Sequence, residues 1–268
     1  MDKNTIIAHY SESNEEKGIL SHILDLAERS RQRSTVESGS FLSEALKMRA
    51  DAMLSHVGYS DYFFFGGYDG AERTCAVFLT DYCGVEEIAE SPSLAEVVFI
   101  KAELDRYNRA AEISHRDVLG SLMGLGIERD AVGDIVVENG TAIFCVKESI
   151  APFIKESLCK ISRYPVSATV YQKLEIHRSE TAEECFDTVA SLRLDAVTAS
   201  LFSTSRSISA EAITAGLVAV NGVTAKKTDM TVSEGDKISY RGHGKAELEK
   251  IDGLSKKGRT RILFKKWK

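Results

Sequence analysis

At roughly 150 residues per domain, the 268-residue chain has room for two or three domains, which excludes a small disulfide-held scaffold. Hydrophobic residues make up 43% and charged residues 28%, with 3 prolines and 19 glycines, so we expect a packed core rather than a disordered chain. Residues 185–268 carry 15 lysines and arginines against 9 acidic residues, whereas residues 1–184 carry 19 against 31. A basic end joined to an acidic body is typical of proteins that bind polyanions.

The cysteines and the hydropathy pattern point to a cytoplasmic protein. There are 5 cysteines and no C-x-x-C pair, which argues against a disulfide framework or a zinc knuckle. No apolar run approaches 18 residues, and the first residues lack the basic-then-apolar order of a secretory signal. We therefore expect reduced thiols, a cytoplasmic location and no membrane association. The histidines show no metal-ligand spacing, so we expect no metal site.

Residues 1–92 are predicted to form an N-terminal α/β domain. Apolar residues at three-to-four spacing predict helices at 15–33 and 42–57. Two strand-like runs follow at 62–65 and 74–79, and the glycine-containing segment 66–73 between them predicts a hairpin loop. A phosphate-binding P-loop is excluded, because this loop has no Gly-Lys-Ser/Thr and does not lead into a helix.

Residues 93–178 follow the order β-α-β-β-α-β. The predicted strands are 97–103, 134–138, 141–146 and 166–171, and the predicted helices are 116–125 and 150–161. Asn139-Gly140 is the pair that a type I′ hairpin turn favours. This order is that of a ferredoxin-like domain, which RNA-recognition domains share. Phe144 is the only aromatic in the third strand, so the pattern does not favour stacking of bases on this sheet.

The segment Ser114-His115-Arg116-Asp117 resembles the start of a kinase catalytic loop, but Leu122 stands where that loop needs Asn. The same four residues fit a capping box that begins a helix. We adopt the capping interpretation and keep His115 and Arg116 as candidates for a secondary RNA contact.

Residues 179–268 are predicted to place two short helices against a small sheet, and the overall class is α+β. A capping box at 181–184 predicts a short helix towards Ser191, followed by helices at 192–202 and 207–215. Gly216 fits a C′ position, and Asn221-Gly222 predicts a type I′ turn between strands 217–220 and 223–224. A further strand is predicted at 237–241, before a basic tail.

A family resemblance in this last part is carried by Arg193-Leu194-Asp195, Ser205-Arg206, Ala212-Ile213, Gly216, Val218, Val220-Asn221-Gly222, Val232, Gly235-Asp236 and residues 238–242. These positions resemble the alpha-L RNA-binding domain named after small-subunit ribosomal protein S4. The remainder resembles the bacterial YlmH family, in Phe65-Gly66-Gly67-Tyr68, Ala71-Glu72-Arg73, residues 115–120 and Gly133-Asp134-Ile135.

The resemblance implies a non-catalytic RNA-binding protein that acts on stalled ribosomes. Its expected partners are the ribosomal RNA of the large subunit and the tRNA bound there. We expect no cofactor, no small-molecule substrate and a monomeric chain.

The cationic residues of the last part support RNA binding independently, since lysines and arginines neutralise phosphates and release counterions. Arg193 on the first predicted helix and Arg206 at the turn can reach one side of a duplex backbone. Ser205 and the first amides of the second helix add neutral donors. The complete predicted contact set is Arg193, Ser205, Arg206, Lys226, Lys227, Arg241 on the next strand, and Lys256, Lys257 and Arg259 in the tail.

Two other functions fit parts of the pattern. Pseudouridine synthases carry a related domain and use an Arg-Leu-Asp whose Asp is catalytic, which would make Asp195 a catalytic residue. That motif has a Gly before the Arg, whereas this chain has Leu192. A DNA-binding helix-turn-helix around Ser203-Thr204-Ser205 is the other, but the hairpins and basic tail fit the alpha-L module better.

Overall fold

The computed structural model describes residues 2–105, 107–108, 111–176 and 183–267. The chain divides into two compact units, Met1–Arg178 and Ser179–Lys268. The predicted boundary between residues 92 and 93 falls inside the first unit and stays a prediction. No helix among the described residues combines the length and the apolar composition needed to cross a membrane.

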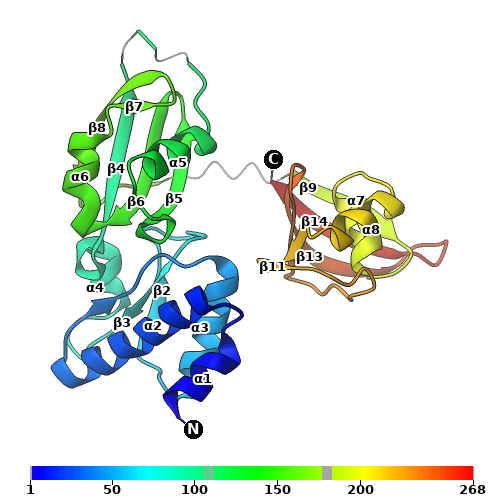
Figure 1. The fold of residues 1–268 in the computed structure, drawn as a ribbon. Coiled ribbons are helices and arrows are strands. Elements are labelled where there is room, and N and C mark those ends of the chain that lie inside the picture. Colours follow the sequence, from blue (N-terminus) through cyan, green and yellow to red (C-terminus); the bar gives the residue numbers. More distant parts are fainter. Residues whose placement is uncertain (1, 106, 109–110, 177–182, 268) are drawn as a thin grey trace. The chain divides into compact units, whose positions relative to one another are not determined.

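The first unit begins with three helices, of which the second and third are the two predicted ones (Figure 1). They are α1 (Lys3–Tyr10), α2 (Asn14–Arg33) and α3 (Glu44–His56). Ser13 begins α2 and Ser43 begins α3, each by accepting a hydrogen bond from a backbone amide of the first helical turn. The apolar face of α2 is buried, as its periodicity predicts.

A three-stranded antiparallel sheet separates these helices from the rest of the unit. Its strands are β1 (Glu37–Ser38), β2 (Tyr62–Phe65) and β3 (Cys75–Phe78), in the order β1-β3-β2. Successive β3 residues face opposite sides, because side chains alternate along a strand. Ala76 and Phe78 pack with the helices, whereas Cys75 and Val77 pack with Val97 and Phe99. The short helix α4 (Val85–Glu90) and a 3₁₀ turn (Pro92–Ala95) then lead into the second sheet.

The second sheet has five antiparallel strands in the order β5-β6-β4-β8-β7. In chain order, this part of the first unit contains β4 (Val97–Leu104), α5 (His115–Gly124), a 3₁₀ turn (Arg129–Ala131), β5 (Val132–Glu138), β6 (Thr141–Lys147), a 3₁₀ turn (Glu148–Ile150), α6 (Ala151–Ser157), β7 (Lys160–Ile161) and β8 (Tyr164–Tyr171). The predicted β-α-β-β-α-β order is confirmed. Asn139 and Gly140 both have positive φ, as a type I′ turn requires.

The predicted helix at 150–161 is wrong at its C-terminal end. The helix ends at Ser157, and Lys160–Ile161 form β7, which pairs with Tyr164 and Pro165 across a tight turn. Ser162 has a φ of 55° in that turn, and Ile161 is fully buried. The buried Ile161 side chain thus belongs to an edge hairpin and not to a further helical turn. Apolar spacing alone does not distinguish these two structures.

Asp134 joins the two sheets of the first unit. Its buried carboxylate accepts hydrogen bonds from the Tyr68 hydroxyl at 2.8 Å and from the backbone amides of Glu72 at 2.7 Å and Arg73 at 3.0 Å. The Arg73 guanidinium donates to the backbone carbonyls of Phe41, Arg129 and Val132. Gly133 is required beside it, because a Cβ there would lie 2.7 Å from the ring of Phe41.

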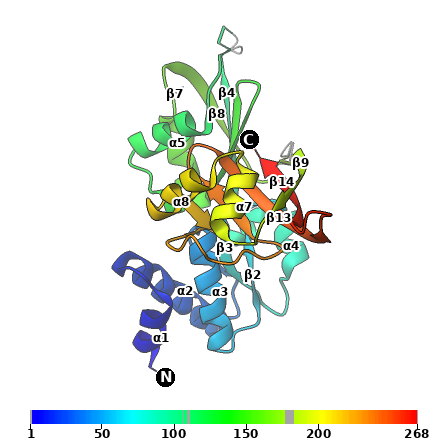
Figure 2. The same ribbon diagram turned by 90° about the vertical axis from the view of Figure 1, so that its right-hand side faces the viewer.

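The second unit packs two helices against one face of a six-stranded antiparallel sheet (Figure 2). In chain order its elements are β9 (Glu183–Val189), α7 (Leu194–Leu201), α8 (Arg206–Thr214), β10 (Val218–Val220), β11 (Val223–Thr224), β12 (Lys237–Tyr240), β13 (Gly244–Leu254) and β14 (Thr260–Trp267). The strand order is β11-β10-β12-β13-β14-β9. Gly216, Asn221 and Gly222 have positive φ, which confirms the predicted helix end and turn.

Two segments of this unit form other structures than predicted. Residues 183–189 form strand β9 rather than a helix, because β14 pairs with them along their whole length. Thr181 and Ala182 of the predicted capping box lie outside the described residues. The predicted basic tail is the hairpin β13–β14, whose inward residues Ile262 and Phe264 belong to the core. Its cations therefore stand on a folded sheet.

Candidate nucleic-acid interface

The segment that begins α7 is held in place by a neighbouring loop. The amide of Leu194 donates to the Met230 carbonyl at 2.7 Å, and the amide of Asp195 donates to the Thr228 carbonyl at 3.0 Å. Arg193 pairs with Thr231 in an isolated β-bridge and is the N-cap residue of α7. Arg193 therefore precedes the helix, whereas the sequence predicted it on the helix. Its backbone is held by the bridge to Thr231 and by the hydrogen bonds of the next two amides.

Asp195 binds two arginines with one carboxylate. It accepts hydrogen bonds from Arg193 at 3.2 Å (Nε) and 3.0 Å (Nη2), and from Arg206 Nη2 at 3.1 Å. The Asp195 side chain is 7% exposed, whereas those of Arg193 and Arg206 are 40% and 53% exposed. The carboxylate is thus buried beneath two guanidinium groups that still face solvent.

Electrostatics favour the ionised form of this cluster. Burial opposes ionisation of Asp195, but the hydrogen bonds and positive charges of Arg193 and Arg206 outweigh it, so the pKa of Asp195 lies below its usual value. The hydrogen bond to Asp195 in turn raises the pKa of Arg193. All three groups are therefore charged at neutral pH, with a net charge of +1 presented outward.

Ser205 and Arg206 occupy the N-terminus of α8. The Ser205 hydroxyl oxygen caps the helix by accepting from the Ile208 amide at 3.2 Å and also shares a hydrogen bond with the Ser207 hydroxyl at 3.0 Å. The role of Ser205 as a donor to RNA stays a prediction. Arg206 is the first residue of the helix, where backbone amides without helical partners favour anions. A guanidinium beside a helix N-terminus is suited to bind a phosphate.

The other predicted contact residues do not all lie near these arginines. Lys226 and Lys227 are exposed and directly precede Thr228, the residue that holds Asp195. Arg241 is exposed but follows the end of β12 instead of lying on a strand as predicted, and its amide donates to Leu217. Lys226 and Lys227 thus extend the surface that Arg193 and Arg206 form. Arg241 instead lies in the turn between β12 and Gly244, where β13 begins.

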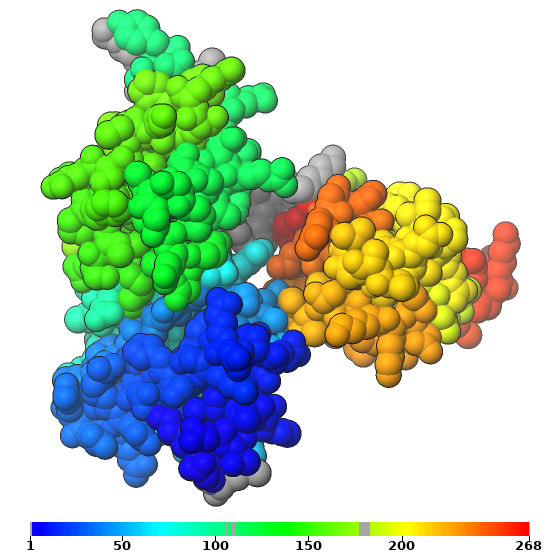
Figure 3. Space-filling view, in the orientation of Figure 1, coloured from blue at the N-terminus to red at the C-terminus, as the bar shows by residue number. Residues whose placement is uncertain are grey.

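Lys256, Lys257 and Arg259 lie in the turn of the hairpin that replaces the predicted tail. The Ser255 amide donates to the Arg259 carbonyl at 2.7 Å and closes the turn. This turn, in red, projects from the second unit (Figure 3). Because β13 has 11 residues at about 3.3 Å each, the turn and Arg241 lie roughly 30 Å apart. One short RNA helix face would not contact all of these cations together.

His115 and Arg116 lie in the first turn of α5, and both are exposed. Ser114 and Asp117 form the predicted capping box, with the Ser114 amide donating to the Asp117 carboxylate at 2.8 Å. Phe144 is fully buried on the helix-covered face of its sheet, and on the opposite face Phe99 and Cys145 pack against the N-terminal sheet. The aromatic side chains of the central strands β4 and β6, Phe99 and Phe144, are thus buried and not available for stacking on bases.

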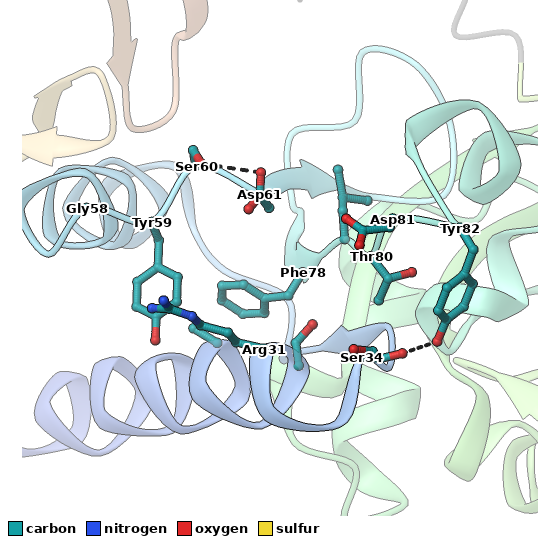
Figure 4. Close-up of a pocket in the computed structure, with 13 residues that line it drawn as sticks. Arg31, Ser34, Gly58, Tyr59, Ser60, Asp61, Phe78, Thr80, Asp81 and Tyr82 are labelled. Carbon is teal, nitrogen blue, oxygen red and sulfur yellow. Dashed lines mark hydrogen bonds between the residues drawn. The ribbon is translucent and has the colours of Figure 1, made fainter.

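A cavity of about 480 Å³ lies in the first unit, where the end of α2 meets the loops before β2 and after β3 (Figure 4). Arg31 and Tyr59 lie at one end of it, and Asp81 and Tyr82 at the other. Neither histidine nor cysteine is present among the described residues that line it. The cavity therefore holds no Ser-His or Cys-His pair for nucleophilic catalysis.

The role of Asp195 as the shared partner of two arginines was not predicted from the sequence. Its only predicted role was catalysis, in the enzyme alternative. The available signal was the spacing of Arg193 and Asp195, since an extended residue just before a helix can reach a carboxylate two positions later. The partnership with Arg206 gave no sequence signal, because it depends on how α7 and α8 pack.

Comparisons with known proteins match both units. Residues 97–175 match the family described as "Putative RNA-binding domain in YlmH", and residues 192–238 match the S4 domain. The chain is 34% identical over 236 residues to "Ribosome-associated protein quality control protein P2" of Bacillus subtilis (strain 168), covering 85% of this chain and 87% of that protein. A solved structure, "Cell division protein ylmH from Streptococcus pneumoniae", is 17% identical, with a TM-score of 0.46, over 60% of this chain and 93% of that chain.

Proposed function

The chain belongs to the YlmH family, and from this we propose that it is a non-catalytic RNA-binding protein that acts on the ribosome. In this proposal it contacts large-subunit ribosomal RNA and the tRNA bound there, as part of the quality control of stalled ribosomes in the cytoplasm. The name of the Bacillus subtilis relative supports the ribosomal association. The basic character of residues 185–268 supports binding to RNA.

The arginine pair held by Asp195 carries the proposal. Both guanidinium groups are oriented by a buried carboxylate and keep further N–H groups exposed to solvent. Orienting them before binding reduces the side-chain entropy that is lost on contact with a phosphate. Arg193 and Arg206, with Lys226 and Lys227 beside them, would bind the sugar-phosphate backbone. Such contacts carry shape and charge information rather than base sequence.

The alternative of an RNA-modifying enzyme requires an available carboxylate at Asp195. Here both oxygens of that carboxylate accept hydrogen bonds from arginines, and the side chain is buried. This geometry supports a positioning role and gives no support to a catalytic one.

The experiment measures binding of the full chain to purified large ribosomal subunits by co-sedimentation over a range of salt concentrations. Arg206→Glu should weaken binding and reduce the slope of log affinity against log salt by about one or more, since one phosphate contact is lost. Lys250→Glu makes the same charge change on β13, at a residue paired with Leu263 on the sheet face away from α7 and α8.

We expect Lys250→Glu to bind nearly as tightly as the unaltered chain. Binding that does not depend on salt, or equal losses in the two variants, would contradict the proposal.

A further inference from the structure

A second cavity, of about 420 Å³, lies in the second unit between β9, α7, the start of α8 and the β13–β14 turn. Its volume is within the range of about 300–1,000 Å³ that is common for small-ligand sites. Part of its wall is formed by the small side chains of Ala190, Ala196 and Ala199, which do not fill the space. Elements on both sides of the matched S4 segment, β9 before it and the turn after it, contribute to the cavity.

Two arginines from distant parts of the chain line this cavity. Arg206 lines the cavity from the start of α8, and its Nη2 donates a hydrogen bond to Asp195. Arg259 reaches it from the hairpin turn, where Nε donates to the Thr188 hydroxyl at 3.1 Å and Nη2 donates to the Thr188 carbonyl. A guanidinium has five N–H donors, so the hydrogen bonds described for each group leave donors to offer. Two such groups at one cavity favour a phosphate.

A carboxylate lines the same cavity. Asp187 accepts one hydrogen bond on each oxygen, from the Ser200 hydroxyl and from the Thr188 amide at 2.7 Å. Each carboxylate oxygen has two lone pairs, so acceptor capacity remains. A carboxylate repels a phosphate but accepts a hydrogen bond from a sugar hydroxyl. The combination therefore matches a ribonucleotide unit, which carries an anion and a hydroxyl donor side by side.

We propose that this cavity binds one sugar-phosphate unit of RNA, with the phosphate between Arg206 and Arg259 and the ribose 2′-hydroxyl donating to Asp187. The proposal rests on the proposed RNA-binding function and adds to it a means of distinguishing RNA from DNA. Since no aromatic side chain is among the described residues that line the cavity, the base is not held by stacking. Recognition here depends on the backbone and not on base identity.

The test compares the affinity of the full chain for a 20-nucleotide RNA stem-loop with that for the same sequence made of DNA. Asp187→Ala should lower the RNA-to-DNA affinity ratio about five- to tenfold, since one hydrogen bond to a charged group is lost only with RNA. Asp252→Ala removes an equal charge from an exposed position on β13 that does not line the cavity. It should change both affinities by the same factor.

Arg259→Ala should weaken binding of both probes about tenfold, whereas Lys250→Ala, at an exposed position of β13 outside the cavity lining, should have a much smaller effect. If Asp187→Ala does not fold, Asp187→Asn preserves the volume and should lower the ratio by a smaller factor.

An unchanged ratio in a folded Asp187 variant, with binding still weakened by Arg206→Glu, would overturn the cavity proposal and leave the proposed function standing. Failure of the unaltered chain to bind RNA or ribosomal subunits would overturn both.

Discussion

Asp195 accepts a hydrogen bond from Arg206 Nη2 at 3.1 Å, which connects the first turn of α7 to the first residue of α8. The same carboxylate binds Arg193, so one buried acid fixes two guanidinium groups, one just before α7 and one at the start of α8. A buried carboxylate without these partners would be unstable, and the arginines without it would be free to rotate. The stability of this unit and its proposed RNA contact therefore depend on one residue.

Asp195→Asn should destabilise the second unit by about 1–2 kcal/mol, a value reduced because both guanidinium groups are exposed to screening solvent. Its affinity for RNA should also fall several-fold, since the arginines lose their fixed orientation. Trp267, the single tryptophan of the chain, lies on β14 and reports unfolding of this unit by fluorescence in urea. Asp252→Asn, at an exposed position of β13, is the matched control. Equal stability of the two variants would contradict this account.

The contribution of Asp195 to the free energy of unfolding should vary with pH only under acidic conditions. Its pKa is lowered in the folded state, so its contribution is fully present above the unfolded value of about 3.9 and is lost as the pH falls through the folded pKa. The difference in unfolding free energy between the unaltered chain and Asp195→Asn should be constant from pH 8 to 5 and shrink below pH 4. A difference that vanished between pH 7 and 6 would implicate another group.

Asp134→Ala should destabilise the first unit by about 3 kcal/mol, because the half-buried Tyr68 hydroxyl and two backbone amides lose their buried acceptor. Far-UV circular dichroism in urea should show an earlier first transition, while the Trp267 fluorescence transition of the second unit stays in place. Glu138→Ala, exposed on the same strand β5, should change stability by less than about 0.5 kcal/mol. Similar effects of the two changes would show that Asp134 is not the joint between the sheets.

The cysteines should differ sharply in reactivity. Burial raises the pKa of the Cys75 thiol to about 12 and raises that of Cys145 well above its usual value. Cys159 is exposed. Iodoacetamide at pH 8 should therefore alkylate Cys159 of the folded chain at least about a hundred times faster than Cys75 or Cys145, because only the accessible thiolate reacts. Peptide mass spectrometry measures each rate, and alkylation in guanidinium provides the control in which all five thiols react. Fast native modification of Cys75 would mean that the core opens readily.

The sequence by itself determined the elements whose signals are local. Helices α2 and α3, the capping box at Ser114 and the type I′ turns at Asn139 and Asn221 depend on spacing and turn chemistry within a few residues. The cationic character of residues 185–268 and the candidate residues Arg193 and Arg206 also followed from the sequence, since charge and motif are written there directly.

Only the tertiary structure decided which of these residues meet. Residues 183–189 became β9 because β14 supplies hydrogen-bond partners along them, and the basic tail became a hairpin for the same reason. The hydrogen bonds of Asp195 with Arg206 and of Asp134 with Arg73 connect different segments of the chain that packing brings together. Partners in a sheet or in a buried ion pair are chosen by packing, and local sequence does not encode the position of a distant segment.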